Sequence, residues 1–556
     1  MAFIGNTVTT QGFTPAVDFF SGNASTTAFT LSKPVASVAQ VQAVIENVPQ
    51  NPGSAYTVSG NTITFTSAPP SGTNNIYVYY TSPITQVIQP SQGTVGATQL
   101  VGGTVNTTAD VVANGLTVGK GGGSVSTNTV VGYQAGQSNT TNPQNTFVGY
   151  TAGYSSTGGY TSAFGYQAGY AITTGTSNTA LGRNSMSSGA GVTGSNNTGV
   201  GESALLNLTS GASNVSVGVE SLRANTTASN NTAVGYQAGY YQTGAYNTVL
   251  GAQALYGASG TSTGGASCAI GYKALYANTS GNYNIAIGNE YTGNWPAPLA
   301  ANTTGSTNIA IGTGALSLNT TSSGNLAIGY VAANSTTGAQ NTAIGTFAMY
   351  GGTTGYGNCA FGYQTLYSLL SGYFNTNIGY QAGSGITSGA NNLCLGQGAG
   401  NTASPSGNLT TQSNRICLGD NSISNAYIQV AWTVTSDARD KADIVDSRYG
   451  LNFVSALRPV EYKWDMRSKY EEGQTPDGTH KETKTNLGFL AQDVIEAEKA
   501  HGGVEKDLLI ADDELDELLR ITETKMIPAL VKAIQELKAL VDAQATEIAE
   551  LKAKVG

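Results

Sequence analysis

The sequence predicts a mainly β protein, in which a long β-solenoid lies between an N-terminal β unit and a C-terminal unit of mixed α and β structure. Three observations support this class. Gly accounts for 73 of the 556 residues and charged side chains for only 10%, compared with about 7% Gly and about 25% charged residues in average proteins. One short phrase recurs through residues 128–421. Residues 1–430 hold only 13 charged side chains, whereas the last 126 residues hold 42.

These patterns divide the chain into five segments. We expect a β module over 1–85, a Gly/Thr/Val-rich connector over 86–127, a repeat shaft over 128–431, a charged α+β domain over 432–511 and C-terminal helices with a coiled coil over 512–556. The change from a nearly uncharged to a normally charged chain marks the junction between shaft and tail.

Composition also excludes several functions. The net charge of −9 argues against a nucleic-acid partner, which requires a basic surface. The sequence contains no signal peptide and no apolar run long enough to span a bilayer, so we expect no membrane insertion. The cysteines are far apart in sequence without metal-ligand spacing, and we interpret them as small buried residues, with neither a metal nor a cofactor: Cys268, Cys359, Cys394 and Cys417.

The N-terminal module alternates apolar and polar residues with the period of half-buried strands. Strands are expected over 27–31, 41–45 and 76–80, and a hairpin over 55–66 with its turn at Ser59–Asn61. The segment 20–31 and the hairpin resemble a small β-sandwich module found near the start of phage tail proteins. The resemblance implies a role in attachment or spacing; a β module without a particular partner remains the alternative.

The repeat array contains seventeen copies of one phrase: Asn, Thr, two small or apolar residues, Gly, two variable residues and Ala. The first copy is 128–135. Most copies follow each other after 16 or 17 residues, which is typical of a stacked solenoid. The repeated glycines are Gly132, Gly149, Gly165, Gly182, Gly201, Gly218, Gly235, Gly251, Gly271, Gly288, Gly312, Gly329, Gly345, Gly362, Gly379, Gly396 and Gly419.

One coil cannot bury its apolar face alone, whereas stacked coils share a continuous core. We expect strands paired in register, ladders of Asn and Thr down the stack, and a shaft on the order of 80 Å long at about 4.8 Å per coil. The array resembles the head repeat of trimeric autotransporter adhesins, a β-roll of short stacked coils. This resemblance implies a homotrimer, although periodicity alone also permits a monomeric solenoid.

Few residues of the array could carry chemistry. Glu202 and Glu220 lie in successive coils and are the one candidate pair of carboxylates for a glycan-cleaving spike, but they follow their glycines by different numbers of residues. The tyrosine rows are predicted to be structural. The longest insertion, 289–308, carries Trp295, which we expect to contact a receptor because insertions in solenoids map to loops on one face.

The charged tail carries three ordered motifs: 434–444, 457–464 and 487–494. Together they resemble the C-terminal intramolecular chaperone domain of phage tail spikes and fibres, the endosialidase-type self-cleaving family. The resemblance implies cleavage of the Thr435–Ser436 bond after a trimer has assembled, with Ser436 as nucleophile and Lys441 as its general base. A lysine can act as such a base when burial lowers its pKa.

The resemblance also assigns supporting residues. Asp437 and Arg439 match motif positions and are expected to fix the loop, while Gln492 matches the third motif. The alternative base for Ser436 is His480, but its surroundings are predicted to form a polar loop. The expected activity is a single-turnover serine autopeptidase and not a multiple-turnover enzyme.

The C-terminal segment is predicted to be helical, with one helix over 512–526 interrupted at Pro528. Beyond it, apolar residues follow a heptad pattern. This pattern favours two strands by the usual rule, whereas the resemblance implies three, and Gln544 in the core could alter the count; we expect three. The first heptad position is occupied by Ile527, Ile534, Val541, Ile548 and Val555, and the second by Leu530, Leu537, Gln544 and Leu551.

Taken together, these features predict a homotrimeric phage tail fibre, made in the host cytoplasm and carried on the virion, which recognises a host surface receptor. Its expected partners are two further copies of itself, other tail or baseplate proteins and the receptor, which could be a glycan. Two alternatives remain: a tail spike that depolymerises surface glycan, and a bacterial trimeric surface adhesin.

Overall fold

The computed structural model describes residues 16–81, 110–113, 115–257, 262–291, 295–471, 473–512 and 518–556. The chain divides into two compact units, Met1–Thr108 and Ala109–Gly556. Most of the predicted connector therefore lies outside the described residues. The mainly β class and the long solenoid are confirmed.

The N-terminal unit consists of two small sheets around one core. One sheet has the order β1-β6-β3-β4 and the other pairs β2 with β5. Apolar side chains of both sheets bury together, including Leu31, Tyr56 and Ile76. A short 3-10 helix, Val38–Gln40, leads into β3. The strands are β1 (Val17–Gly22), β2 (Ala28–Val35), β3 (Val41–Ile45), β4 (Val48–Pro49), β5 (Tyr56–Phe65) and β6 (Gly72–Tyr80).

The hairpin predicted over 55–66 is wrong. These residues form the single strand β5, which pairs antiparallel with β2. Gly60, at the expected turn, has a φ of 58° and interrupts the regular pairing without reversing the chain. The turn signal was outweighed because β2 pairs with β5 from Gly60 to Thr64.

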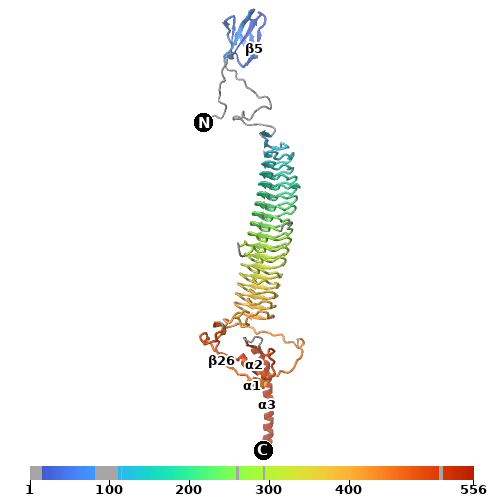
Figure 1. Cartoon of the computed structure of the whole chain (residues 1–556), viewed down its shortest axis with the longest axis vertical. Coiled ribbons are helices and arrows are strands. Elements are labelled where there is room, and N and C mark those ends of the chain that lie inside the picture. The colour runs from blue at the N-terminus through green and yellow to red at the C-terminus, as the bar shows by residue number, and fades with distance from the viewer. Residues whose placement is uncertain are drawn as a thin grey trace. The chain divides into compact units, whose positions relative to one another are not determined.

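Among the described residues of the second unit, seventeen short strands form a ladder of parallel neighbours in register (Figure 1). Each strand leads directly into one of the repeated glycines or includes it. The strands are β9 (Thr129–Gly132), β10 (Thr146–Val148), β11 (Ser162–Phe164), β12 (Thr179–Leu181), β13 (Thr198–Val200), β14 (Val215–Val217), β15 (Thr232–Val234), β16 (Thr248–Leu250), β17 (Cys268–Ile270), β18 (Ile285–Ile287), β19 (Ile309–Ile311), β20 (Leu326–Ile328), β21 (Thr342–Ile344), β22 (Cys359–Phe361), β23 (Thr376–Ile378), β24 (Leu393–Leu395) and β25 (Ile416–Leu418).

The central residue of each strand points into the shaft, while its two neighbours point outward, as the period of a strand requires. The inward position is most often Ala, and the Ala three residues after the repeated glycine packs beside it, as with Ala233 and Ala238. A leucine or methionine that follows this second position in many coils fills the remaining space, as Leu222 and Leu255 do.

Buried asparagines form the predicted ladder. The side-chain oxygen of Asn197 accepts a hydrogen bond from the backbone N–H of Asn214 at 3.0 Å, and Asn214 accepts from the N–H of Asn231 at 3.0 Å. The Asn214 amide also donates to the carbonyl of Ala228 at 2.9 Å. Each Asn thus satisfies a backbone group that the corner of the next coil would otherwise bury without a partner.

We expect Asn214→Ala to destabilise the shaft by about 1–3 kcal/mol, because it leaves the Asn231 N–H and the Ala228 carbonyl buried without this partner. Hydrogen exchange at Asn231 should accelerate and the melting temperature should fall. Thr227→Ala, at an exposed position of the next coil, is the control and should leave both unchanged. Equal exchange rates in the two variants would contradict the role of the ladder.

The N-terminal end of the shaft carries a cap that the sequence analysis missed. Strands β7 (Val111–Ala113) and β8 (Leu116–Gly119) form an antiparallel pair, and β8 pairs antiparallel with β9. The Asp110 carboxylate accepts hydrogen bonds from the N–H groups of Lys120 and Gly121 at 2.6 and 2.7 Å. The pair covers the edge of the ladder, which would otherwise expose unpaired backbone groups.

The charged tail folds around its own small core. The helices α1 (Leu451–Ala456) and α2 (Ala491–Ala500) pack with the start of α3 (Met526–Val555) around Phe453 and Val494. Strands β26 (Val460–Tyr462) and β27 (Asn486–Gly488) pair antiparallel, with a 3-10 helix at Arg467–Lys469 between them. The buried carboxylate of Glu498 accepts backbone hydrogen bonds from Leu509, Ile510 and Ala511, at 2.7–3.0 Å.

The helix predicted over 512–526 is wrong for the described residues. Strands β28 (Ala511–Asp512) and β29 (Arg520–Ile521) pair antiparallel there, followed by a 3-10 helix at Glu523–Lys525. Pro528 lies in the first turn of α3 instead of interrupting a helix, since a proline is tolerated where the N–H has no partner within the helix. The remaining 30-residue helix covers the whole predicted heptad segment.

Candidate functional site

The structure brings the proposed nucleophile and base together. Ser436 follows the last shaft strand by an extended segment, and a 3-10 helix, Ala438–Asp440, begins two residues later. This short helix folds the chain back, so that the Lys441 Nζ lies 2.6 Å from the Ser436 Oγ and donates a hydrogen bond to it. Thr435, Ser436 and Lys441 are exposed in the single chain.

Asp437 and Arg439 form the 3-10 helix cap beside this pair. The Asp437 carboxylate accepts a hydrogen bond from the Arg439 N–H at 2.9 Å and pairs with its guanidinium at 2.6 Å. These bonds with Arg439 lower the pKa of the Asp437 carboxyl below its usual value. Asp437 thus caps the 3-10 helix that leads to Lys441, and the supporting role of Asp437 and Arg439 stays a prediction.

The second and third motifs meet in space. They contribute β26 and β27, and Arg458 binds the carboxylate of Asp493 with nitrogen–oxygen distances of 2.8 and 2.9 Å. Gln492 is exposed in the first turn of α2 and, within the described residues, makes no hydrogen bond to Ser436 or Lys441. The structure of the single chain therefore brings Ser436 and Lys441 together but leaves Gln492 apart from them.

His480 is engaged elsewhere. Its ring packs edge-to-face against Tyr470 with centroids 4.8 Å apart, and its backbone N–H donates to the Tyr470 hydroxyl at 3.2 Å. Because Lys441 already contacts the serine and His480 belongs to another loop, the geometry favours lysine as the base.

The carboxylates considered for glycan cleavage have other partners. Glu202 forms an ion pair with Arg183, and Glu220 accepts a hydrogen bond from Gln237 at 2.8 Å and lies 3.6 Å from Arg223. A glycosidase needs one protonated carboxyl as acid beside a free carboxylate. In the structure each of these two carboxylates is held by partners of its own and not by the other carboxylate.

Trp295 lies half-buried on the shaft, where its ring packs edge-to-face against Tyr350 and Tyr330, with centroids 6.0 and 6.5 Å apart. Elsewhere tyrosines of successive coils stack in rows, such as Tyr133 with Tyr150 at 5.2 Å. Aromatic packing thus accounts for these rows. The insertion is anchored through Trp295, and a receptor contact there remains a prediction.

Two searches of the described residues bear on other functions. They hold no group of three or more His, Cys, Asp or Glu side chains that could bind a metal ion. Likewise, no helix within the described parts of the chain combines the length and apolar character that crossing a bilayer requires.

With this geometry in place, comparison with known proteins gives one result. Residues 436–503 match the model of the family described as chaperone of endosialidase. This confirms the resemblance inferred from the three motifs, and the match begins at Ser436, the residue after the predicted cleavage point. In the other two comparisons, no curated protein and no solved structure matched this chain. We refer to residues 436–503 as the chaperone domain.

One pair of residues escaped the sequence analysis. Cys394 and Cys417 were interpreted as isolated small residues, yet they are direct partners at the centres of β24 and β25. Both occupy the position two residues before a repeated glycine, and aligning the copies would have shown this. Both are buried as predicted, whereas Cys268 and Cys359 begin their strands and are half-buried.

Proposed function

We propose that this protein is a homotrimeric phage tail fibre whose shaft is folded with the help of the C-terminal chaperone domain. The observation that carries the proposal is the succession of the two parts. A ladder of seventeen strands ends at Leu418, and the family match begins at Ser436, 18 residues later. A stiff β shaft joined directly to a chaperone of this family suits a fibre or spike.

The exposed stripe of α3 supports association of several chains. Both heptad positions are exposed in the single chain, with Ile534 at 65% and Leu537 at 49%. Exposed apolar stripes of this length are costly in water unless other helices cover them. Two further copies of the same chain provide helices with the matching pattern, so the coiled coil gathers three carboxyl ends.

The outward face of the shaft supports the same assembly. The residues on either side of each inward position point outward, and many are apolar, such as Leu250, Ile378 and Leu418, which are 43–53% exposed. In parallel sheets, both faces are normally covered. Packing of three shafts along this face would bury these side chains over the whole ladder.

The contact between Lys441 and Ser436 supports self-cleavage at the Thr435–Ser436 bond. The Lys441 amine, as general base, takes the hydroxyl proton of Ser436 while the hydroxyl oxygen attacks the carbonyl carbon of Thr435. The proton then passes to the Ser436 nitrogen, the amide bond breaks, and an ester links Thr435 to the Ser436 oxygen. Water hydrolyses this ester, leaving a Thr435 carboxylate and a Ser436 with a free amine and hydroxyl.

Assembly would control this reaction. A lysine becomes a base when its surroundings exclude water, and both side chains are exposed in the single chain. Packing against neighbouring chains would supply the missing burial, so cleavage would follow trimer formation. The released shaft could not regain its chaperone and would be kinetically stable.

The assembled fibre would be made in the host cytoplasm and act on the virion, where the N-terminal unit binds other tail or baseplate proteins. The shaft would then recognise a host surface receptor, with the insertion at Trp295 as the candidate contact. The depolymerase alternative has little support, because Glu202 and Glu220 are both paired with cations.

Ile534→Asp tests the assembly. Light scattering should give the native protein three times the chain mass of 56.7 kDa, or three times the shaft mass after cleavage. The variant should elute at the mass of one chain, because a charge at the core of the coiled coil opposes burial. Gln535→Asp, one residue away at an exposed position outside the heptad stripe, should remain trimeric. A single-chain mass for the native protein would contradict the proposal.

A further inference from the structure

The inward side chains at the C-terminal end of the shaft differ from those of the other coils. Strands β23, β24 and β25 place Asn377, Cys394 and Cys417 at successive inward positions, where most coils have Ala. All three are buried, with Cys417 5% exposed and the other two fully covered. The Asn377 amide adjoins the Cys394 thiol. Neither its nitrogen nor its oxygen has a hydrogen bond to another nitrogen or oxygen.

The register brings the two thiols into range of each other. Cys394 and Cys417 are paired residues of adjacent parallel strands and point to the same side. Neighbouring strands lie about 4.8 Å apart, within the range of roughly 4.4–6.8 Å between Cα atoms that disulfides span. β25 is the last strand of the ladder, so it has no following coil to resist a small shift.

We propose that Cys394 and Cys417 form a reversible disulfide that joins the last two coils of the shaft. The oxidant is a small-molecule disulfide such as oxidised glutathione. The Cys417 thiolate attacks one of its sulfurs and expels one glutathione thiolate. Cys394 then loses its proton, attacks the Cys417 sulfur and expels the second. The two protein thiols lose two electrons and two protons, and the oxidant becomes two molecules of glutathione.

The surroundings assign different roles to the two sulfurs. A hydrogen bond with Cys394 lowers the pKa of Cys417 to about 6 against the effect of burial, assisted by Ser406, Arg520 and Arg415. The hydrogen bond with Cys417, together with burial, raises the pKa of Cys394. Because Cys417 lines the cavity at the end of the shaft and Cys394 lies on the preceding strand, Cys417 meets the oxidant first and Cys394 resolves the mixed disulfide.

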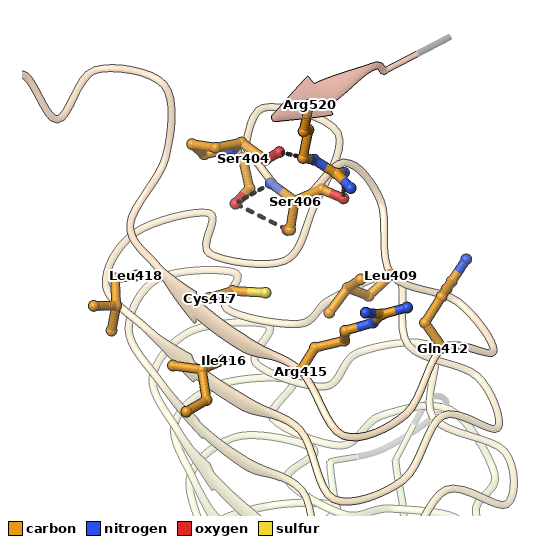
Figure 2. Close-up of a pocket in the computed structure, with 10 residues that line it drawn as sticks. Ser404, Ser406, Leu409, Gln412, Arg415, Ile416, Cys417, Leu418 and Arg520 are labelled. Atoms are coloured by element: carbon orange, nitrogen blue, oxygen red, sulfur yellow. Dashed lines mark hydrogen bonds between the residues drawn. The ribbon is translucent and has the colours of Figure 1, made fainter. Parts of the chain in front are cut away.

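The oxidant can reach Cys417 through a cavity of about 290 Å³ at the end of the shaft. Figure 2 shows Cys417 in its wall, with Ser404 and Ser406 on the overlying loop and Arg415 beside it. Arg520 holds that loop by donating hydrogen bonds to the carbonyls of Pro405 and Ser406. The arginines suit an anionic thiol reagent, and Cys394 lies one strand further in.

The disulfide would protect an open end. If the chain is cut before Ser436, β25 becomes the last ordered coil of a shaft without its C-terminal domain, and terminal repeats need a cap. This role rests on the proposed function, whereas the cross-link itself does not. In reducing solution the thiols leave the coil free to assemble, and in oxidising solution the bond fixes it.

The test treats the purified full chain with oxidised glutathione, alkylates it in denaturant and digests it with trypsin. Cleavage after Arg415 places Cys394 in peptide 274–415 and Cys417 in peptide 416–439, or 416–435 after self-cleavage. Peptide 274–415 also contains Cys359. We expect the two peptides to be found joined, with the mass of their sum less two hydrogens plus one alkyl group on Cys359, and the alkylated form of the second peptide to be lost. Reductant should restore both.

Three controls make the outcome decisive. Cys268 and Cys359 lie in β17 and β22, with four strands between them, and should remain alkylated. Cys394→Ala restores the residue found at most inward positions and should fold, lose the link and leave Cys417 as a mixed disulfide with glutathione. A link that persists in Cys394→Ala, or a native chain whose second peptide is recovered only unlinked, would overturn the proposal, whether or not the chain cleaves itself.

Discussion

Ser436→Ala is expected to leave the chain intact at 56.7 kDa, whereas the native protein separates into residues 1–435 and the 121 residues from Ser436 to Gly556. The substitution removes the hydroxyl that contacts the Lys441 amine at 2.6 Å, and no other group in this contact can form the ester. Gel electrophoresis and intact mass measurement of the two purified proteins distinguish the cleaved chain from the intact one.

Lys441→Met extends this test to the base. It keeps the length of the side chain but cannot accept the serine proton, so cleavage should slow by about 10²–10⁴-fold. Lys484→Met, at an exposed position of the loop before β27, is the matched control and should cleave at the native rate. Cleavage of the Ser436→Ala chain at the same bond would rule out this nucleophile. An uncut native trimer would rule out self-processing while leaving a role in folding open.

Gly235→Ala is expected to destabilise the shaft on the order of 3 kcal/mol or more, the range of the most damaging substitutions. Gly235 has a φ of 136°, which side chains disfavour, and an added Cβ would lie 2.6 Å from the carbonyl oxygen of Gly251 in the next coil. Since backbone lies on the far side of the contact, the coils must separate to relieve it. The loss of β circular dichroism on heating reports the effect.

Gly189→Ala gives the comparison. Gly189 belongs to the same array, but its backbone lies outside the left-handed region and an added Cβ would meet no atom within 4 Å. We expect its melting temperature to equal that of the native protein. If both variants had the same melting temperature, close stacking of the repeated glycines would not determine the stability of the shaft.

Much of this molecule could be predicted from the sequence because its physics is repetitive. The repeated glycine fixed each strand, and the recurring Asn predicted a ladder that the buried bonds from Asn197 through Asn231 confirm. Once the position of the strand within one coil is known, the register of strand pairing along the whole stack follows. Three motifs were enough to find the chaperone domain, and the resemblance that they carry singled out Ser436 and Lys441, whose side chains lie in contact.

Two of the failures arose because a turn or helix signal was outweighed by strand pairing. The turn at Gly60 was overridden by β2, and the helical pattern of 512–526 by the pairing of β28 with β29. The β7–β8 cap lies within residues 111–119, and the Asn-Gly dipeptide at 114–115 is a hairpin signal that was missed. The adjacency of Cys394 and Cys417 appears only when distant copies of the repeat are aligned. Among the described residues Gln492 makes no hydrogen bond to Ser436, and its role stays a prediction.

The ladder of coils has one more consequence. Each strand bonds only to the strands before and after it. If residues 309–325 were removed, Leu326 would take the place of Ile309 beside β18, and the next two positions would still hold Ala and Ile. The length of the shaft can therefore change by whole coils, about 5 Å each, while the sequences at its two ends stay the same. Duplication or loss of short gene segments would then adjust the length of the proposed fibre.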